Sequence, residues 1–210
     1  MPSAMKKLRV GLSRERIEEA AAVLIERDGL DAFSTRKLAG ELDCEAMSIY
    51  YHFPSKAHLL EALVDRALKS LMPLPPGDLG PIEQLRQVAW RIRDLAVNQP
   101  NLCLHLVVHR LDGKVGLSFY DQLAAIFLSA APDEETAARF FASYGFFVRG
   151  AVAVAANAKA IGTRAVEPPD PARLPHDYPA FSALAPHFGG KDFEAGLDLM
   201  LAGFAATFRP

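Results

Sequence analysis

The residues best suited to chemistry lie between Ser34 and Lys56. Hydroxyl, aromatic and cationic side chains follow one another there, and each kind can donate a hydrogen bond to a phosphate oxygen. The residues with this capacity are Thr35, Lys37, Ser48, Tyr50, Tyr51, His52 and Lys56. Arg36 can bind guanine through two hydrogen bonds, Ser48 can bond several bases, and Ala46 and Met47 offer apolar contact to a thymine methyl group. This set predicts a surface that binds double-stranded DNA.

The apolar pattern predicts that a helix-turn-helix positions these side chains. Ser34 or Thr35 begins a short helix, and Asp43 makes the turn that follows, because aspartate tolerates a left-handed backbone. A second helix runs from about residue 45 to residue 51 and turns Ile49 toward the core. Such a helix enters the major groove with its N-terminal end toward the bases.

Helices are also predicted on either side of this motif. Ser13 is an N-cap residue, and Gly29 ends the first helix where a left-handed residue is favoured. Ser55 caps a fourth helix that extends to about Met72. Residues 73–81 hold four prolines and two glycines, so they form a corner without regular structure.

Helical spacing continues to the end of the chain, and no strand pattern interrupts it. We therefore expect an all-α fold with a three-helix helix-turn-helix domain and a larger C-terminal helical domain. The expected domains are residues 1–58, beginning with a mobile basic arm at 1–12, and residues 59–210. Residues 162–177 are expected to form a loop.

Several of these side chains have a second interpretation. Arg36 can form a surface ion pair, Tyr50 can be a packing aromatic, and Lys56 can be a solvated helix start. The arm at 1–12 either contacts the DNA backbone or has no role. The net charge of −2 supplies no overall basic field, so DNA binding is predicted from the motif alone.

Small residues recur in the two helices near residues 140–158 and 192–208, where they allow close approach of backbones. Two such helices from each of two copies predict a four-helix dimer interface. Its expected residues are Gly145, Val148, Val152, Gly196, Met200, Gly203 and Phe204. Packing within one chain is the alternative. Arg149 lies at the centre of the first stretch, and a mid-membrane charge costs about 2.5–3.5 kcal/mol, so we expect a buried helix of a soluble protein.

Bulky side chains between residues 82 and 158 predict an apolar pocket. The candidates are Trp90, Cys103, His105, His109, Phe119, Tyr120, Phe127, Phe140, Tyr144 and Phe147. Each of them can instead be an ordinary core residue. His105 and His109 are one helical turn apart, but no third ligand accompanies them, so no metal is expected.

The stretches FSTRKLAGEL and MSIYYHFPSK, with their spacing from Ser13 to Leu71, resemble the tetracycline-repressor (TetR) family of bacterial regulators. FFASYGFFVRGAV and FEAGLDLMLAGF are similar to the two dimer helices of the subgroup nearest the tetracycline repressor. The resemblance implies a homodimer that binds operator DNA and a small-molecule effector. Asp43 stands where a glycine is usual, and Ala46-Met47 leaves the reading helix poor in hydrogen-bonding groups.

The predicted function is a repressor that an effector releases from a palindromic operator. An effector-independent regulator or an activator is the alternative, and an enzyme on a helical scaffold is a remote one, since no nucleophile–base pair or phosphate loop occurs. No cofactor is expected. Two isolated cysteines and the lack of a signal peptide indicate the cytoplasm, with no membrane partner.

Overall fold

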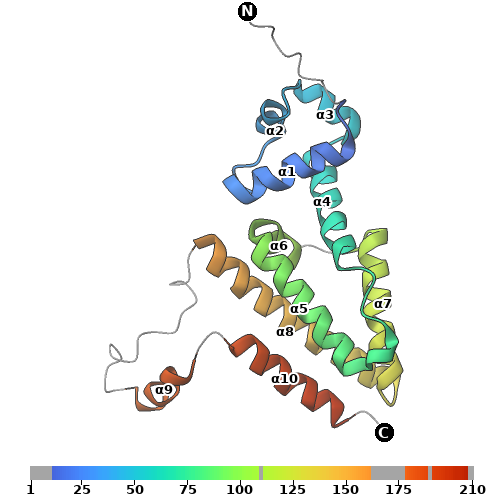
Figure 1. Cartoon of the computed structure of the whole chain (residues 1–210), viewed down its shortest axis with the longest axis vertical. Coiled ribbons are helices and arrows are strands. Elements are labelled where there is room, and N and C mark those ends of the chain that lie inside the picture. Colours follow the sequence, from blue (N-terminus) through green and yellow to red (C-terminus); the bar gives the residue numbers. More distant parts are fainter. Residues whose placement is uncertain (1–10, 109–110, 162–177, 189–190, 208–210) are drawn as a thin grey trace, which may run out of the picture. The chain divides into compact units, whose positions relative to one another are not determined.

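The computed structural model describes residues 11–108, 111–161, 178–188 and 191–207. They form ten α-helices and two short 3-10 helices, with no strand in these ranges, which confirms the all-α prediction (Figure 1). The helices are α1 (Arg14–Asp28), α2 (Thr35–Glu41), α3 (Ala46–His52), α4 (Lys56–Leu71), α5 (Pro81–Asn98), α6 (Pro100–Val108), α7 (Lys114–Ala130), α8 (Glu134–Ile161), α9 (Pro179–Leu184) and α10 (Asp192–Ala205), with η1 at Gly77–Leu79 and η4 at Ala185–His187. The predicted arm at 1–12 and the loop at 162–177 lie largely or wholly outside the described residues.

The chain divides into two compact units. The first ends at Val64 and the second begins at Asp65, so the division falls within α4. Leu59 and Leu63 are buried on the first side of this division, and Leu68 is buried on the second. One continuous helix therefore supplies core residues to both units.

Caps at both ends define the helices of the first unit. The Ser13 hydroxyl accepts a hydrogen bond from the Arg16 amide at 3.3 Å and so caps α1, as predicted. Gly29 ends α1 with a φ of 83°, a value that residues with a side chain rarely adopt. Ser34, of the two candidates, caps α2 by accepting from the Lys37 amide at 3.3 Å.

The turn between α2 and α3 has the predicted chemistry. Asp43 adopts a φ of 51°, the left-handed conformation expected of it. The Cys44 amide then donates to the Ala39 carbonyl at 3.0 Å and closes the end of α2. Ile49 and Phe53 are buried, which fixes the face of α3 that points inward and leaves its other face outside.

Charged side chains also connect α1 to α2. Arg27 pairs with Asp28 at 2.8 Å and with Glu41 at 2.7 Å, and Lys37 lies 3.7 Å from Asp28. The hydrogen bond from Arg27 lowers the pKa of the Asp28 carboxyl. All four groups are near water, so these pairs orient the two helices more than they stabilise them.

In the second unit, α8 packs against α5, α6 and α7, while α10 lies along α5 and α8 (Figure 1). By length and composition, residues 134–159 of α8 could cross a membrane, although one such helix is weak evidence. Only 22% of its apolar stretch is buried within the chain, so α8 is not the fully buried helix that we expected. One face packs inward and the other remains exposed.

Aromatic rings fill the interior between α7, α8 and α10. Phe127 is 1% exposed, and its ring makes edge contacts with Phe141, Tyr144 and Phe204 at centroid distances of 5.8, 5.6 and 6.2 Å. Edge-to-face contacts of this kind add about 0.5–1.5 kcal/mol each beyond burial. Phe127 is therefore the central ring of the cluster.

Tyr144 joins this cluster to α5, because its buried hydroxyl donates to the Leu85 carbonyl at 2.7 Å. Burial raises the pKa of Tyr144 above its ordinary value of 10.0. Above that pH the unfolded chain loses the proton while the folded chain keeps it, so folding becomes less favourable as pH rises.

Tyr144→Phe is expected to cost about 0.5–1.5 kcal/mol at neutral pH, because one buried hydrogen bond is lost. The difference from the unsubstituted chain should shrink above pH 10.0, where only the tyrosine carries the ionisation penalty. Urea unfolding at several pH values measures both effects. A difference that stays constant or widens with pH would contradict this account of Tyr144.

Candidate DNA-binding surface and effector cavity

The outer face of the helix-turn-helix presents Arg36, Met47 and Tyr51. Arg36, on the first turn of α2, is exposed and has no hydrogen bond or ion pair with any described residue. Met47 is 61% exposed and Tyr51 is 87% exposed. The alternative of an intramolecular ion pair for Arg36 is thus not observed among the described residues, and its guanidinium is available to a ligand.

Thr35 and Tyr50 interact across the motif. Their hydroxyls lie 3.0 Å apart, so one donates to the other and connects α2 to α3. Tyr50 remains 39% exposed. Its position is therefore compatible with the predicted phosphate contact as well as with the contact to Thr35. Ser48 and Ala46 lie beside it on α3 and are half-buried.

The two lysines predicted to hold phosphates have partners within the chain. Lys37 is directed toward Asp28 of α1 at 3.7 Å. The Lys56 ammonium donates to the Phe33 carbonyl at 2.8 Å and lies 5.3 Å from the centre of the Phe33 ring. Lys56 therefore holds the loop before α2 as well as offering its remaining N–H groups outward.

Arg14, at the start of α1, was not among the predicted functional residues, but it contacts the end of α3. Its guanidinium stacks 4.1 Å from the centre of the Phe53 ring and donates to the His52 carbonyl at 2.5 Å. It thereby fixes the end of α3 against the start of α1. His52 lies 38 residues away in the chain, so the local sequence around Arg14 does not reveal this contact.

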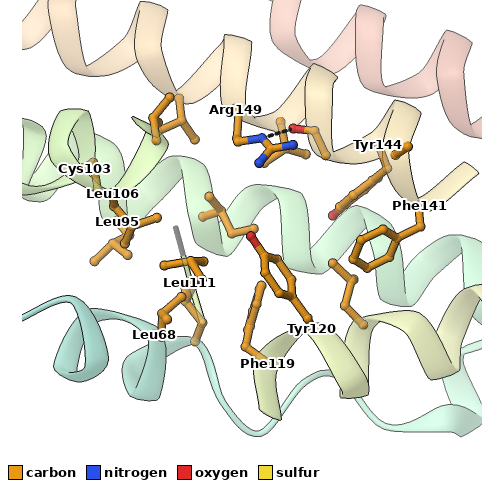
Figure 2. A pocket seen from close by; sticks show the side chains of 18 residues that line it. Leu68, Leu95, Cys103, Leu106, Leu111, Phe119, Tyr120, Phe141, Tyr144 and Arg149 are labelled. Carbon is orange, nitrogen blue, oxygen red and sulfur yellow. Dashed lines mark hydrogen bonds between the residues drawn. The ribbon is translucent and has the colours of Figure 1, made fainter. Parts of the chain in front are cut away.

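A cavity of about 330 Å³ lies in the second unit, between α4, α5, α6, α7 and α8 (Figure 2). Four predicted pocket residues line it, namely Cys103, Phe119, Tyr120 and Tyr144. Leu68 and Leu71, at the C-terminal end of α4, form part of its wall. Neither these leucines nor Arg149 was among the predicted pocket residues, although Arg149 was conspicuous as a charge in an apolar run.

The other predicted pocket residues lie elsewhere. Trp90 and Phe147 both pack on Phe193 of α10, with centroid distances of 5.0 and 5.9 Å. Phe127 and Phe140 pack on Phe204. None of these four, nor His105, lines the cavity. His109 lies outside the described residues, within which no group of three metal-binding side chains occurs.

The predicted dimer residues divide into three groups. Gly145, Val148 and Val152 line the cavity, and the two valines are buried within their own chain. Gly196 lies against Phe147, where a Cβ would approach the ring to 3.0 Å, and Phe204 is buried in the aromatic cluster. Met200 is half-buried, and Gly203 is exposed.

Apolar residues beside those positions face outward instead. On α8, Phe146 is 72% exposed and Val154 is exposed as well; on α10, Leu199 is 77% exposed. The same two helices also carry exposed alanines and glycines, including Gly150, Ala195, Ala202 and Gly203. We call this exposed surface the α8–α10 face. Its bulky apolar residues are of the kind that a protein partner covers.

Two family models cover almost the whole of this arrangement. Residues 17–63 match the model of bacterial regulatory proteins of the tetR family, and residues 73–208 match the tetracyclin repressor-like C-terminal domain. The chain belongs to the TetR family of bacterial transcriptional regulators. Members of this family are DNA-binding regulators and not enzymes.

Individual relatives agree with this assignment. An HTH-type transcriptional regulator of Saccharopolyspora erythraea is 25% identical over 98% of this chain and 90% of its own length. The HTH-type transcriptional repressor DrrR1 of Streptomyces coeruleorubidus is 36% identical over 45% of this chain, which spans 32% of that relative. The structure of ActR from Streptomyces coelicolor in complex with actinorhodin is 25% identical, with a TM-score of 0.74 over 94% of this chain and 98% of that one.

Proposed function

We propose that this chain is a homodimeric repressor that a small-molecule effector releases from operator DNA in the cytoplasm. The observation that carries the proposal is the cavity of about 330 Å³, whose wall includes the last turn of α4. The same helix supplies Leu59 and Leu63 to the core of the DNA-binding unit. A ligand in the cavity therefore contacts a helix that both units share. The repressor DrrR1 and the complex of ActR with actinorhodin support the same function by similarity.

The helix-turn-helix surface is suited to direct contact with only a few base pairs. Arg36 supplies a bidentate guanine contact, and Met47 and Ala46 supply apolar contact to thymine methyl groups. Thr35, Ser48, Tyr50, Tyr51 and His52 bind phosphates, as do the remaining N–H groups of Lys37 and Lys56. Two copies of such a surface, one helical turn apart on a palindrome, supply the rest of the specificity.

The α8–α10 face is the dimer interface in this proposal. Phe146, Val154 and Leu199 are covered by the same surface of a second copy, around a two-fold axis. Gly203 and Met200 remain in the interface that the sequence predicted, whereas Phe146, Val154 and Leu199 replace Val148 and Val152. The division into DNA-binding and effector-binding domains near α4 is part of the same proposal.

Release follows from a shift in population between two conformations. A ligand that binds one arrangement of α4 more tightly than the other favours that arrangement by the difference in affinity. If the favoured arrangement changes the spacing of the two recognition helices, they no longer match successive major grooves about 34–36 Å apart. A thermal-shift screen for ligands, followed by gel shifts with and without each hit, separates this repressor from an effector-independent regulator.

Arg36→Ala is expected to weaken binding to an operator from the gene's upstream region by at least about 30-fold, because the homodimer loses one bidentate base contact in each half-site, each worth roughly 1–3 kcal/mol. The variant should also lose part of its preference over random DNA. Fluorescence anisotropy with both duplexes at one salt concentration measures the two quantities.

Lys37→Ala is the matched control, because Lys37 is the next residue on α2 but is directed toward Asp28. We expect a smaller loss that is equal for operator and random DNA. An Arg36→Ala protein with unchanged preference would show that Arg36 does not read bases.

A further inference from the structure

We propose that the cavity takes a planar aromatic anion, with Arg149 and Tyr120 as its two polar contacts. This inference rests on the proposed function of the cavity as an effector site and names the chemical class of the effector. It follows from the side chains that line the cavity and from the partners that those side chains already have.

The walls of the cavity select an apolar, flat ligand. Aliphatic side chains from α4, α5 and α6, such as Leu68, Leu95 and Leu106, form one side, and the rings of Phe119 and Phe141 stand on another (Figure 2). These two rings favour an aromatic ligand, because offset and edge-to-face contacts between rings add to the free energy gained from burial. A volume of about 330 Å³ is at the lower end of the range for drug-sized ligands.

Arg149 is the charged side chain among the described residues that line the cavity. Its Nε donates to the Gly145 carbonyl at 3.1 Å, and its guanidinium lies 5.6 Å from the centre of the Phe146 ring. No carboxylate pairs with it in the described part of the chain. The Nη groups therefore keep their N–H donors for a ligand, while the bond to Gly145 holds the guanidinium in place.

Gly145 contributes to this placement. A Cβ at this position would lie 3.4 Å from an Nη atom of Arg149, at the limit of ordinary van der Waals contact. The guanidinium therefore folds back directly over the backbone of Gly145.

The two tyrosines of the cavity have different roles. The Tyr144 hydroxyl is already used, since it donates to the Leu85 carbonyl. The Tyr120 hydroxyl makes no hydrogen bond with a described residue. Figure 2 shows the hydroxyl of Tyr120 directed toward the middle of the lining residues, while the guanidinium of Arg149 lies along α8 beside the Gly145 carbonyl. Together they offer one charged donor group and one neutral hydroxyl.

The balance of charge decides between a cationic and an anionic ligand. No aspartate or glutamate is among the described residues that line the cavity, so a cation would meet Arg149 with nothing to offset the repulsion. An anion would instead form a charge-assisted hydrogen bond with Arg149, and such bonds are stronger than those between neutral groups. A carboxylate or phenolate on an aromatic framework satisfies both the walls and Arg149.

Three fluorescent probes that differ at one ring position test this inference: anthracene carboxylate, anthracene carboxamide and aminomethyl anthracene. Their dissociation constants are measured with the full chain at low and high salt. We expect the carboxylate to bind at least about tenfold more tightly than either of the others. The preference should fall as salt rises, because Arg149 is near water.

Arg149→Gln is expected to reduce the preference for the carboxylate over the carboxamide to about one, whereas Arg149→Lys retains it. Tyr120→Phe should weaken carboxylate binding by a smaller factor, about two- to tenfold. Arg139→Gln is the matched control, since Arg139 lies on the same helix, is exposed and pairs with Glu135 away from the cavity. That variant should keep the preference.

The outcomes separate this inference from the proposed function. A chain that binds operator DNA yet takes the carboxamide or the ammonium as tightly as the carboxylate overturns the anionic class and leaves the regulator function intact. Equal loss of preference in Arg139→Gln and Arg149→Gln also overturns it, as does a failure to bind any of the three probes. A chain that fails to bind operator DNA, but prefers the carboxylate through Arg149, contradicts the proposed function and supports the ligand class.

Discussion

Leu199→Glu is expected to leave the chain folded but to convert the dimer into a monomer. Leu199 is 77% exposed on α10, so the substitution removes little packing within the chain. In the proposed dimer the two-fold axis places two such leucines in one interface, and the variant would bury two carboxylates there. Burial of an unpaired carboxylate costs several kcal/mol, in addition to the roughly 1.5–3 kcal/mol lost for each buried leucine.

DNA binding should fall with the dimer. Two linked recognition helices bind a palindrome more tightly than one by about 10²- to 10⁴-fold, because the second contact is made at high effective concentration. We therefore expect Leu199→Glu to reduce operator affinity by a factor in that range. Light scattering after size-exclusion chromatography measures the mass, and a gel shift measures the affinity.

Leu128→Glu is the control for this experiment. Leu128 is 54% exposed, but it lies on α7 and outside the α8–α10 face. The same change of residue there should leave both the mass and the operator affinity as they are. If the Leu199→Glu protein remains a dimer and binds its operator normally, the dimer interface lies elsewhere on the surface.

The sequence predicted the local structure of the first unit because local structure depends on near neighbours. Ser13, Ser34 and Ser55 are N-caps with hydroxyls that act within three residues, and Asp43 makes its turn through its own backbone. Such interactions are properties of a short stretch of chain. They could be predicted without any knowledge of the tertiary structure.

Partners far apart in the chain could not be predicted in this way. Lys56 binds the Phe33 carbonyl, and Arg14 binds the carbonyl of His52, across 23 and 38 residues. Helical periodicity indicates that a residue points inward, but not which neighbour it meets. For that reason Phe147 was assigned to the pocket although it stacks on Phe193.

The same limit applies to α8, which has apolar residues on most of its circumference. Val148 and Val152 face the cavity, whereas Phe146 and Val154 face outward. All four are apolar, so composition does not separate the inner face from the outer one. The inner face of α8 is the one that packs against α5, α6 and α7, and these contacts are made in the tertiary structure.

Phe127→Ala is expected to lower the free energy of unfolding by about 3–5 kcal/mol, the usual cost of removing a buried aromatic ring. Phe127 is 1% exposed and contacts three other aromatic rings, so its loss leaves a cavity that helices α7, α8 and α10 must share. Natural proteins are stable by about 5–15 kcal/mol in total, so this one change removes a large part of the stability. Urea unfolding at a fixed protein concentration measures the effect, since a dimer also gains stability from association.

Leu128→Ala is the matched control, because Leu128 is the next residue of α7 and is largely exposed. Its truncation should change stability by less than about 0.5 kcal/mol, as surface substitutions do. Phe127→Leu should fall between the two, since leucine refills part of the volume. If Phe127→Ala cost no more than Leu128→Ala, the ring cluster would not be the core that holds α10 to α7 and α8, and Leu199 on α10 could not report on a fixed interface.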